Sequence, residues 1–309
     1  MEIILWSAVL LASLAVLLKG AEVFVSKAAL VALNLGISYT VIGITLVALG
    51  TSLPELAAGA ASVFKGAGEF VAGTVVGSNT ANICFILGIT AIVFGKFKLS
   101  GHIMRRDAPV MAVAAVILSL ITVNGVIGRI EGLILFLLYP TYLVFASGGP
   151  GERPDKSGRL KKRTITYLVL SAAAIFIGAE FTVRSVVRLT EILGLADTSI
   201  LALTVVAIGS SLPELVVSMA AAKKGFFDMC LGNVVGSNIC NSLLVVGAPA
   251  LISPLPASRI LIEIGLPFML AATFILPVVS IGGSFGRISG TFMLALFAGF
   301  IAALSLALQ

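Results

Sequence analysis

Residues 50–55, GTSLPE, recur as residues 209–214, GSSLPE, at an offset of 159 residues. The match extends without a gap over residues 41–88 and 200–247, where 20 of the 48 aligned pairs are identical. Similarity at a fixed offset is the signature of an internal repeat, in which each copy forms one structural unit. The repeat therefore predicts that the chain is built from two related halves.

The repeat lies in a strongly apolar chain. Of the 309 residues, 59% are apolar and only 11% are Asp, Glu, Lys or Arg, whereas an average soluble domain has about 25% charged residues. Apolar stretches recur at the length of roughly 20 residues that a helix needs to cross a bilayer. The sequence predicts an all-α integral membrane protein with ten transmembrane helices, over residues 3–26, 39–64, 70–95, 108–124, 130–146, 165–189, 199–222, 229–252, 260–280 and 288–308.

Each half contains five of these predicted spans. An odd number of crossings forces the second copy to enter the membrane from the opposite side, so the repeat is expected to be inverted. We predict a first five-helix repeat over residues 1–146, a linker over 147–164 and a second, inverted repeat over 165–309. Inverted repeats place matching residues near each other at mid-depth and suit alternating access to one central site.

The distribution of basic residues predicts the orientation. Connections after odd-numbered spans hold 15 Lys and Arg residues, and those after even-numbered spans hold 5. By the positive-inside rule, both termini face outside and the 147–164 linker is cytoplasmic, in a protein of the cell membrane. The net charge of +6 reflects this bias and not a nucleic-acid surface. No basic residue precedes the first span, so it is expected to be a permanent helix and not a cleaved signal.

Two glutamates lie at matching positions deep in the apolar spans. Glu55 is the only charged residue in residues 28–64, and a bare carboxylate at that depth costs a few kcal/mol or more. The same placement recurs at Glu214, which favours a bound cation or proton as the compensating charge. Pro54 and Pro213 each remove a helical hydrogen bond and leave backbone oxygens that could contribute to a cation site.

A second matching cluster is GSNTAN at residues 77–82 and GSNICN at residues 236–241. Its serines and asparagines are four residues apart, so each pair projects oxygens from one helix face: Ser78 with Asn82, and Ser237 with Asn241. Such residues often connect membrane helices by hydrogen bonds, but their recurrence beside the glutamates favours ligand roles. Oxygen-only sites suit hard cations, and flexible ones suit Ca²⁺ better than Mg²⁺.

Both motif pairs resemble the alpha repeats of sodium/calcium exchangers in the cation/Ca²⁺ antiporter superfamily, of the prokaryotic type. The resemblance covers both halves of the chain and implies ten helices and exchange of several Na⁺ for one Ca²⁺. It implies shared Ca²⁺ and Na⁺ ligands at Glu55 and Glu214, and further ligands at Thr51, Ser210, Ser78, Ser237 and the carbonyls of Ala48 and Ala207.

The chain departs from this pattern at one position. Some prokaryotic exchangers carry Asp where this chain has Asn241, whereas both halves here carry Asn, at Asn82 and Asn241. The formal charge of the site is then −2, which one Ca²⁺ neutralises. The coupling ion and the stoichiometry stay open at this point.

Other functions are weighed against exchange of Ca²⁺ for Na⁺. A Ca²⁺/H⁺ antiporter, in which the glutamates alternate between metal and protons, remains an alternative. A passive cation channel is less favoured because the polar residues cluster at one depth. An enzyme is not expected, since no His or Lys accompanies the serines of the motifs. No cofactor and no obligatory protein partner are expected beyond the transported ions and the bilayer.

Two further sets of residues are expected to be structural. Cys84, Cys230 and Cys240 lie in apolar spans without Cys-x-x-Cys spacing, which indicates small buried residues and neither a disulfide nor a zinc site. Glu22 follows Lys19 by three residues near the end of the first span. An ion pair between them is expected.

Overall fold

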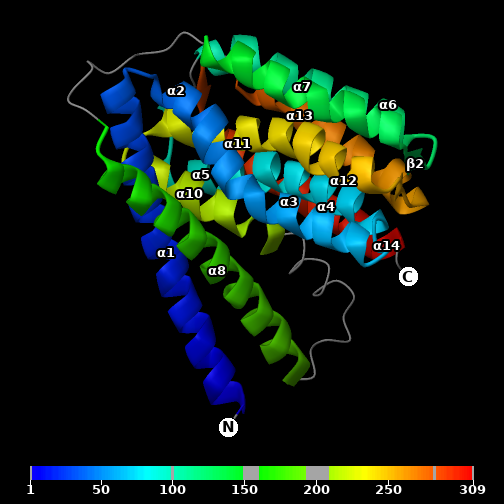
Figure 1. Ribbon diagram of the computed structural model, residues 1–309, viewed down its shortest axis with the longest axis horizontal. Coiled ribbons are helices and arrows are strands. Elements are labelled where there is room, and N and C mark those ends of the chain that lie inside the picture. Colours follow the sequence, from blue (N-terminus) through cyan, green and yellow to red (C-terminus); the bar gives the residue numbers. More distant parts are fainter. Residues whose placement is uncertain (1, 99–100, 149–159, 193–208, 281–282, 308–309) are drawn as a thin grey trace.

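The computed structural model describes residues 2–98, 101–148, 160–192, 209–280 and 283–307, which form helices and four two-residue strands joined by short connections (Figure 1). The α-helices are α1 (Glu2–Leu35), α2 (Tyr39–Ile42), α3 (Ala48–Phe64), α4 (Glu69–Ala81), α5 (Leu87–Phe94), α6 (Ala108–Thr122), α7 (Arg129–Ser147), α8 (Lys162–Ile192), α10 (Leu212–Lys223), α11 (Phe227–Cys240), α12 (Val246–Ile252), α13 (Leu266–Val279) and α14 (Arg287–Ala307). The π-helices are η1 (Gly43–Val47), η2 (Asn82–Ile86), η3 (Ile103–Asp107), η4 (Asn241–Val245) and η5 (Leu261–Gly265), and the strands are β1 (Phe97–Lys98), β2 (Val126–Ile127), β3 (Leu255–Pro256) and β4 (Ser284–Phe285).

Within the described residues, eight continuous helical segments are long and apolar enough to cross a membrane. They are Glu2–Leu35, Tyr39–Phe64, Glu69–Phe94, Arg129–Ser147, Lys162–Leu189, Phe227–Ile252, Leu261–Val279 and Arg287–Ala307. Each matches one predicted span. Of the two other predicted spans, 108–124 corresponds to α6, which η3 directly precedes, and the beginning of 199–222 lies outside the described residues.

The first helix is longer than the predicted span. Helix α1 continues beyond residue 26 to Leu35, so Lys27, which follows the predicted span, lies inside the helix. The residues that follow Lys27 are apolar except for Asn34, and neither Gly nor Pro occurs before Gly36. Gly36 has a φ of 65°, the left-handed conformation in which glycine commonly ends a helix.

The π-helical segments recur with the repeat. Asn82 begins η2 and Asn241 begins η4, and these residues are 159 positions apart. Ile103 and Leu261, 158 positions apart, likewise begin η3 and η5. The counterpart of η1 would fall at residues 202–206, outside the described residues. Single-turn π-bulges are frequent at functional sites, and two of these begin at predicted ligands.

The short strands connect the two halves of the chain. β1 pairs with β4 through Phe97 and Phe285, and β2 pairs with β3 through Val126 and Pro256. Moving Phe97 forward and Phe285 back by the repeat offset of 159 gives Pro256 and Val126. Each sheet is therefore the counterpart of the other under the repeat.

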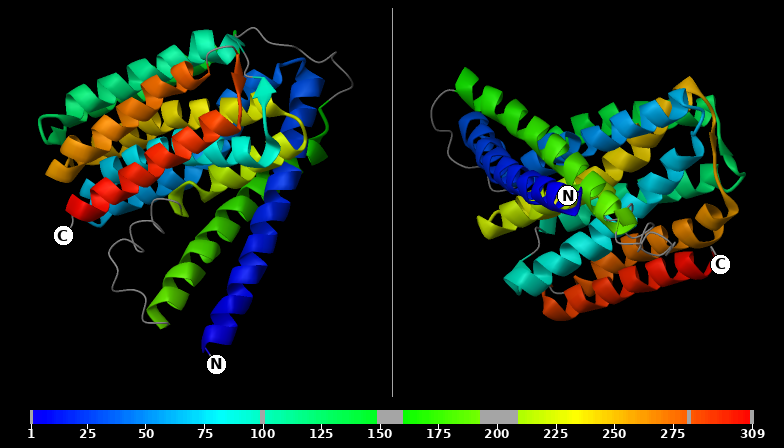
Figure 2. Two further views of the ribbon diagram at one scale, coloured as in Figure 1. Left: turned by 180° about the vertical axis from the view of Figure 1, so that it is seen from behind. Right: turned by 90° about the horizontal axis from the view of Figure 1, so that it is seen from below.

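Helices α1 and α8 lie side by side and project from the bundle formed by the other helices (Figures 1 and 2). Their backbones approach closely at two glycines. A Cβ at Gly178 would lie 2.8 Å from the Leu17 nitrogen, and one at Gly20 would lie 3.2 Å from the Ile175 nitrogen. Small residues permit such close helix crossings in membranes, and these two glycines match in the repeat.

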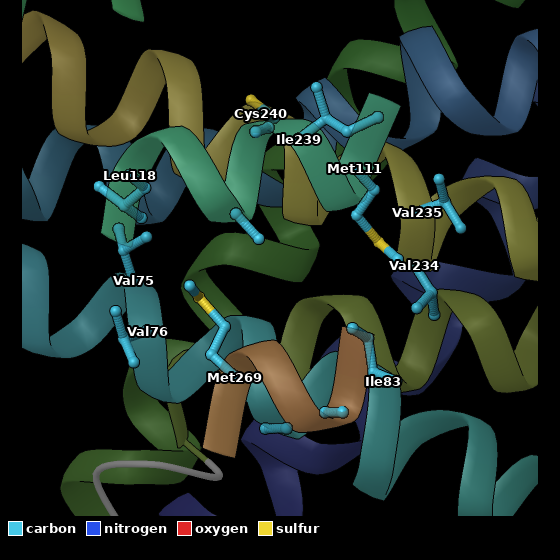
Figure 3. Packing of buried hydrophobic residues seen from close by; sticks show 14 of the residues in the cluster. Val75, Val76, Ile83, Met111, Leu118, Val234, Val235, Ile239, Cys240 and Met269 are labelled. Atoms are coloured by element: carbon cyan, nitrogen blue, oxygen red, sulfur yellow. The ribbon is translucent and has the colours of Figure 1, made fainter. Parts of the chain in front are cut away.

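The core of the bundle is built around α4 and α11. Val75 and Ile83 from the first half and Val234 from the second belong to one cluster of buried residues, together with Met111 and Met269 (Figure 3). α11 also contacts η1 at the backbone, since a Cβ at Gly236 would lie 2.3 Å from the Ile44 carbonyl oxygen. The motif residues of α4 and α11 are thereby fixed at the centre of the molecule.

Candidate cation-binding site

Glu55 on α3 and Glu214 on α10 meet in the interior. Their exposed fractions are 5% and 0%, and the helices that carry them are in contact. The Ser52 hydroxyl donates a hydrogen bond to Glu214 Oε1 at 3.2 Å. Glu214 Oε2 and both carboxylate oxygens of Glu55 have no hydrogen-bond partner among the described residues. Three carboxylate oxygens are therefore available to an ion.

No basic side chain compensates these carboxylates within the described part of the chain. The ion pairs found there all join partly exposed side chains, and none includes Glu55 or Glu214. One of them is the predicted pair of Lys19 and Glu22, at 3.3 Å, which is confirmed. Two like charges in a dry interior repel each other and are costly to bury. The arrangement requires a cation or a proton.

Hydroxyl groups from opposite halves pair beside the glutamates. Thr51 Oγ1 lies 3.3 Å from Ser237 Oγ, and Ser78 Oγ lies 3.0 Å from Ser210 Oγ. The two pairs correspond under the repeat. The Ala48 carbonyl oxygen lies 3.2 Å from Thr51 Oγ1 and 3.5 Å from Ser237 Oγ. Five of the predicted ligands are thus joined by direct contacts between the halves.

The two asparagines of the predicted site have different surroundings. Asn82 Nδ2 donates to Asn238 Oδ1 at 3.0 Å. Among the described residues, Asn82 Oδ1 has no hydrogen-bond partner, and neither polar atom of the Asn241 side chain has one. Both side chains are fully buried. Their π-helices pack against the glutamate helices, η2 against α10 and η4 against α3. The last predicted ligand, the carbonyl of Ala207, lies outside the described residues.

A pair of asparagines without a predicted role connects α4 and α11. Asn238 Nδ2 donates to the Asn79 carbonyl at 3.1 Å, and Asn79 Nδ2 lies 3.4 Å from the Asn238 carbonyl. The two residues are 159 positions apart, so this reciprocal contact joins a residue to its own counterpart. The signal was present in the sequence, because both belong to the repeated Gly-Ser-Asn motif.

Asn233 also lies at the site, and the sequence did not lead us to predict it. Its Oδ1 lies 3.2 Å from Thr51 Oγ1, and its Nδ2 lies 3.0 Å from Ser218 Oγ and 3.4 Å from the Glu214 carbonyl. The side chain is fully buried. Its counterpart in the first half is Thr74, so comparison of the repeats does not single it out. The sequence feature that could have identified it is a polar amide within the apolar predicted span 229–252.

Access to the two glutamates differs. The described residues of α3, α4, α8 and the segment before α10 line a cavity of about 620 Å³ that includes Glu55, Thr74, Glu180 and Ser210. Glu55 and Thr74 also line a second cavity of about 40 Å³. Asn233, the counterpart of Thr74, instead bonds next to Glu214. Glu55 therefore lines both of these cavities, whereas the fully buried Glu214 lines neither of them.

Comparison with known proteins identifies the family. A family model described as sodium/calcium exchanger protein matches residues 5–148 and 163–306. The chain belongs to the sodium/calcium exchanger family. A similar relative is the sodium/calcium exchanger MaX1 of Methanosarcina acetivorans, 33% identical over 96% of this chain and 97% of the relative. The putative antiporter CaxA of Alkalimonas amylolytica is 30% identical over 94% and 95% of the two chains.

Solved structures of a sodium/calcium exchanger share the fold. The sodium-calcium exchanger NCX_Mj, in crystals soaked with 10 mM Na⁺ and no Ca²⁺, matches with a TM-score of 0.85 at 29% identity, over 97% of this chain and 99% of that chain. The family is one of membrane transporters.

Proposed function

We propose that the protein is a secondary active antiporter that exchanges Ca²⁺ for Na⁺ at a site centred on Glu55 and Glu214. The observation that carries this proposal is the pair of buried carboxylates, one from each half, without a basic partner among the described residues. One Ca²⁺ balances their formal charge of −2. Membership of the sodium/calcium exchanger family, and the sodium and calcium in the names of its relatives, support these two ions as the substrates.

We propose that both halves supply the ligands. The carboxylates of Glu55 and Glu214 are assigned the largest role. The neutral oxygens are assigned to Asn82, Asn241, Thr51, Ser210, Ser78, Ser237 and the carbonyls of Ala48 and Ala207. The flexible, oxygen-rich coordination that Ca²⁺ adopts suits this set. The same oxygens serve Na⁺ when Ca²⁺ leaves.

We propose that the chain crosses the membrane ten times as two inverted repeats, residues 1–146 and 165–309, joined by the linker 147–164. Two observations support a two-fold relation between the halves. The repeat offset relates the β1–β4 pair to the β2–β3 pair, and Asn79 and Asn238 contact each other reciprocally. Such a relation suits alternating access. The 620 Å³ cavity at Glu55 is then the approach that is open in this conformation.

Transport in sealed vesicles tests the exchange. An outward Na⁺ gradient is expected to drive Ca²⁺ uptake at constant pH, and a pH gradient without Na⁺ is expected to drive none. The opposite result would favour the Ca²⁺/H⁺ antiporter. Uptake with neither gradient, driven only by the Ca²⁺ gradient, would favour a channel.

The orientation gives a separate prediction. With the linker inside and the connection after α3 outside, Ser157→Cys is expected to resist an impermeant thiol reagent added to intact cells. Lys65→Cys, at an exposed position after α3, is the matched control and is expected to react. Background labelling should be low because Cys84, Cys230 and Cys240 are buried. Reaction at residue 157 with protection at residue 65 would reverse the orientation.

A third carboxylate tests the role of the amides. Asn241→Asp is expected to lower the Michaelis constant for Ca²⁺ several-fold, since added ligand charge tightens Ca²⁺ sites, and to reduce maximal flux because release slows. Transport should also become more sensitive to mild acid, since like-charge repulsion favours a protonated carboxyl group. Ca²⁺ affinity and flux measured from about pH 6 to 8 check this.

From the sequence we expect Asn82→Asp to behave alike. The structure adds one difference, because Asn82 donates a buried hydrogen bond to Asn238 that an aspartate cannot make. Its gain in Ca²⁺ affinity should therefore come with lower thermal stability. Unchanged affinity in both variants would show that neither side chain lies near the ion.

A further inference from the structure

A cavity outside the ion site lies where α1 meets the start of α8. Its volume is about 440 Å³. Its lining residues are Val23, Lys27, Lys161, Arg163, Thr164 and Tyr167. Three of these six residues are cations: Lys27 on α1, and Lys161 and Arg163 at the beginning of α8. The cavity therefore presents a concentrated positive charge at the junction of two helices.

Two of the three cations lie beside one aromatic ring. Lys27 Nζ lies 5.4 Å from the centroid of the Tyr167 ring, and the Arg163 guanidinium carbon lies 5.3 Å from it. Arg163 also donates a hydrogen bond to the Tyr167 hydroxyl at 3.2 Å. Cation–π contacts at exposed sites contribute about 0.5–1 kcal/mol. They position the two cations but leave their charge unneutralised.

Carboxylates balance the cations elsewhere on these two helices but not in the cavity. Lys19, Arg184 and Arg188 each pair with a glutamate at 2.6–3.3 Å. The three lining cations have no carboxylate within 4.0 Å among the described residues. The cavity thus has the charge of an anion site and no anionic side chain of its own in that part of the chain.

The surroundings of the cavity are apolar and face outward. Ile165 and Val169 on α8 have exposed fractions of 46% and 61%, and Leu30 on α1 has 38%. Both helices are long enough to span a membrane, so these side chains face lipid. A ligand that combines a phosphate with acyl chains satisfies both features, and basic pockets between membrane helices suit anionic headgroups.

We propose that this cavity binds the headgroup phosphate of an anionic phospholipid, which links α1 to α8. Lys27 contacts the phosphate from α1, and Lys161 and Arg163 contact it from the start of α8. The acyl chains lie along Ile165 and Val169. This proposal depends on the membrane location of the chain and not on which ions it transports, so binding measurements test it separately from exchange.

Native mass spectrometry of the purified full chain in detergent tests the proposal, with phosphatidylglycerol and phosphatidylcholine added at equal concentrations. The wild type is expected to retain phosphatidylglycerol preferentially. The triple variant Lys27→Gln/Lys161→Gln/Arg163→Gln should lose most of that preference, by about fivefold for each cation removed. The matched control Lys96→Gln/Lys98→Gln/Arg105→Gln removes equal charge from another connection and should bind as the wild type does.

Two control measurements complete the test. Lys27→Arg keeps the charge and should retain phosphatidylglycerol, which separates loss of charge from loss of folding. Inorganic phosphate at millimolar concentration should not displace the lipid. Equal lipid retention by the triple variant and the wild type would overturn the proposal. Displacement by inorganic phosphate would overturn it in favour of a soluble anion.

Discussion

Glu55→Gln and Glu214→Gln are each expected to abolish Ca²⁺ uptake driven by a Na⁺ gradient. Each change removes half of the formal charge that holds the ion, in an interior where the described residues provide no other anion near it. An uncompensated charge at membrane depth costs a few kcal/mol, so we expect the flux to fall by at least about 100-fold. Uptake of radioactive Ca²⁺ into proteoliposomes measures the loss.

Both variants are expected to remain folded, because a neutral amide of the same shape removes the repulsion between two buried carboxyl groups. Their melting temperatures should equal or exceed that of the wild type. Glu69→Gln, at an exposed position at the start of α4, is the matched control and should transport normally. Wild-type flux in either buried variant would remove the central role assigned to these glutamates.

Hydropathy was sufficient to predict most helices, because a membrane span needs a fixed length of apolar chain. It failed at the end of α1, since one lysine does not end a helix when its long side chain can reach an interface. It also gave no indication of the π-helices at Asn82 and Asn241. A π-bulge depends on how neighbouring helices accommodate an extra residue, which local sequence does not specify.

The repeat identified most of the candidate site, because residues that supply equivalent ligands are identical or similar in both halves. It could not predict the difference between the halves. Ser52 and Ser211 occupy equivalent positions, yet Ser52 donates to Glu214 while the buried Ser211 hydroxyl has no partner among the described residues. The same residue type has a different hydrogen-bond environment in each half, which follows from the conformation and not from the repeated motif.

Gly236→Ala is expected to cause the largest loss of stability from a single added methyl group. Its Cβ would lie 2.3 Å from the Ile44 carbonyl oxygen and 2.7 Å from the Ala48 Cβ. Because backbone atoms and not a flexible side chain occupy this space, α11 and η1 must move apart. Overpacking of this kind typically costs about 1–3 kcal/mol, and the melting temperature in detergent should fall by several degrees.

The same change should also impair transport, because the atoms that move belong to the site. The Ala48 carbonyl lies 3.5 Å from Ser237 Oγ, and Ser237 directly follows Gly236 on α11. Gly299→Ala on α14 is the matched control, since the nearest atom to its Cβ would be 3.9 Å away and an alanine inside a helix is favoured over glycine by about 1 kcal/mol. It should leave flux unchanged and stability equal or higher. If Gly236→Ala kept both wild-type stability and wild-type Ca²⁺ affinity, the close contact between α11 and η1 would not position the ligands, and the Ala48 carbonyl would lose its assigned role.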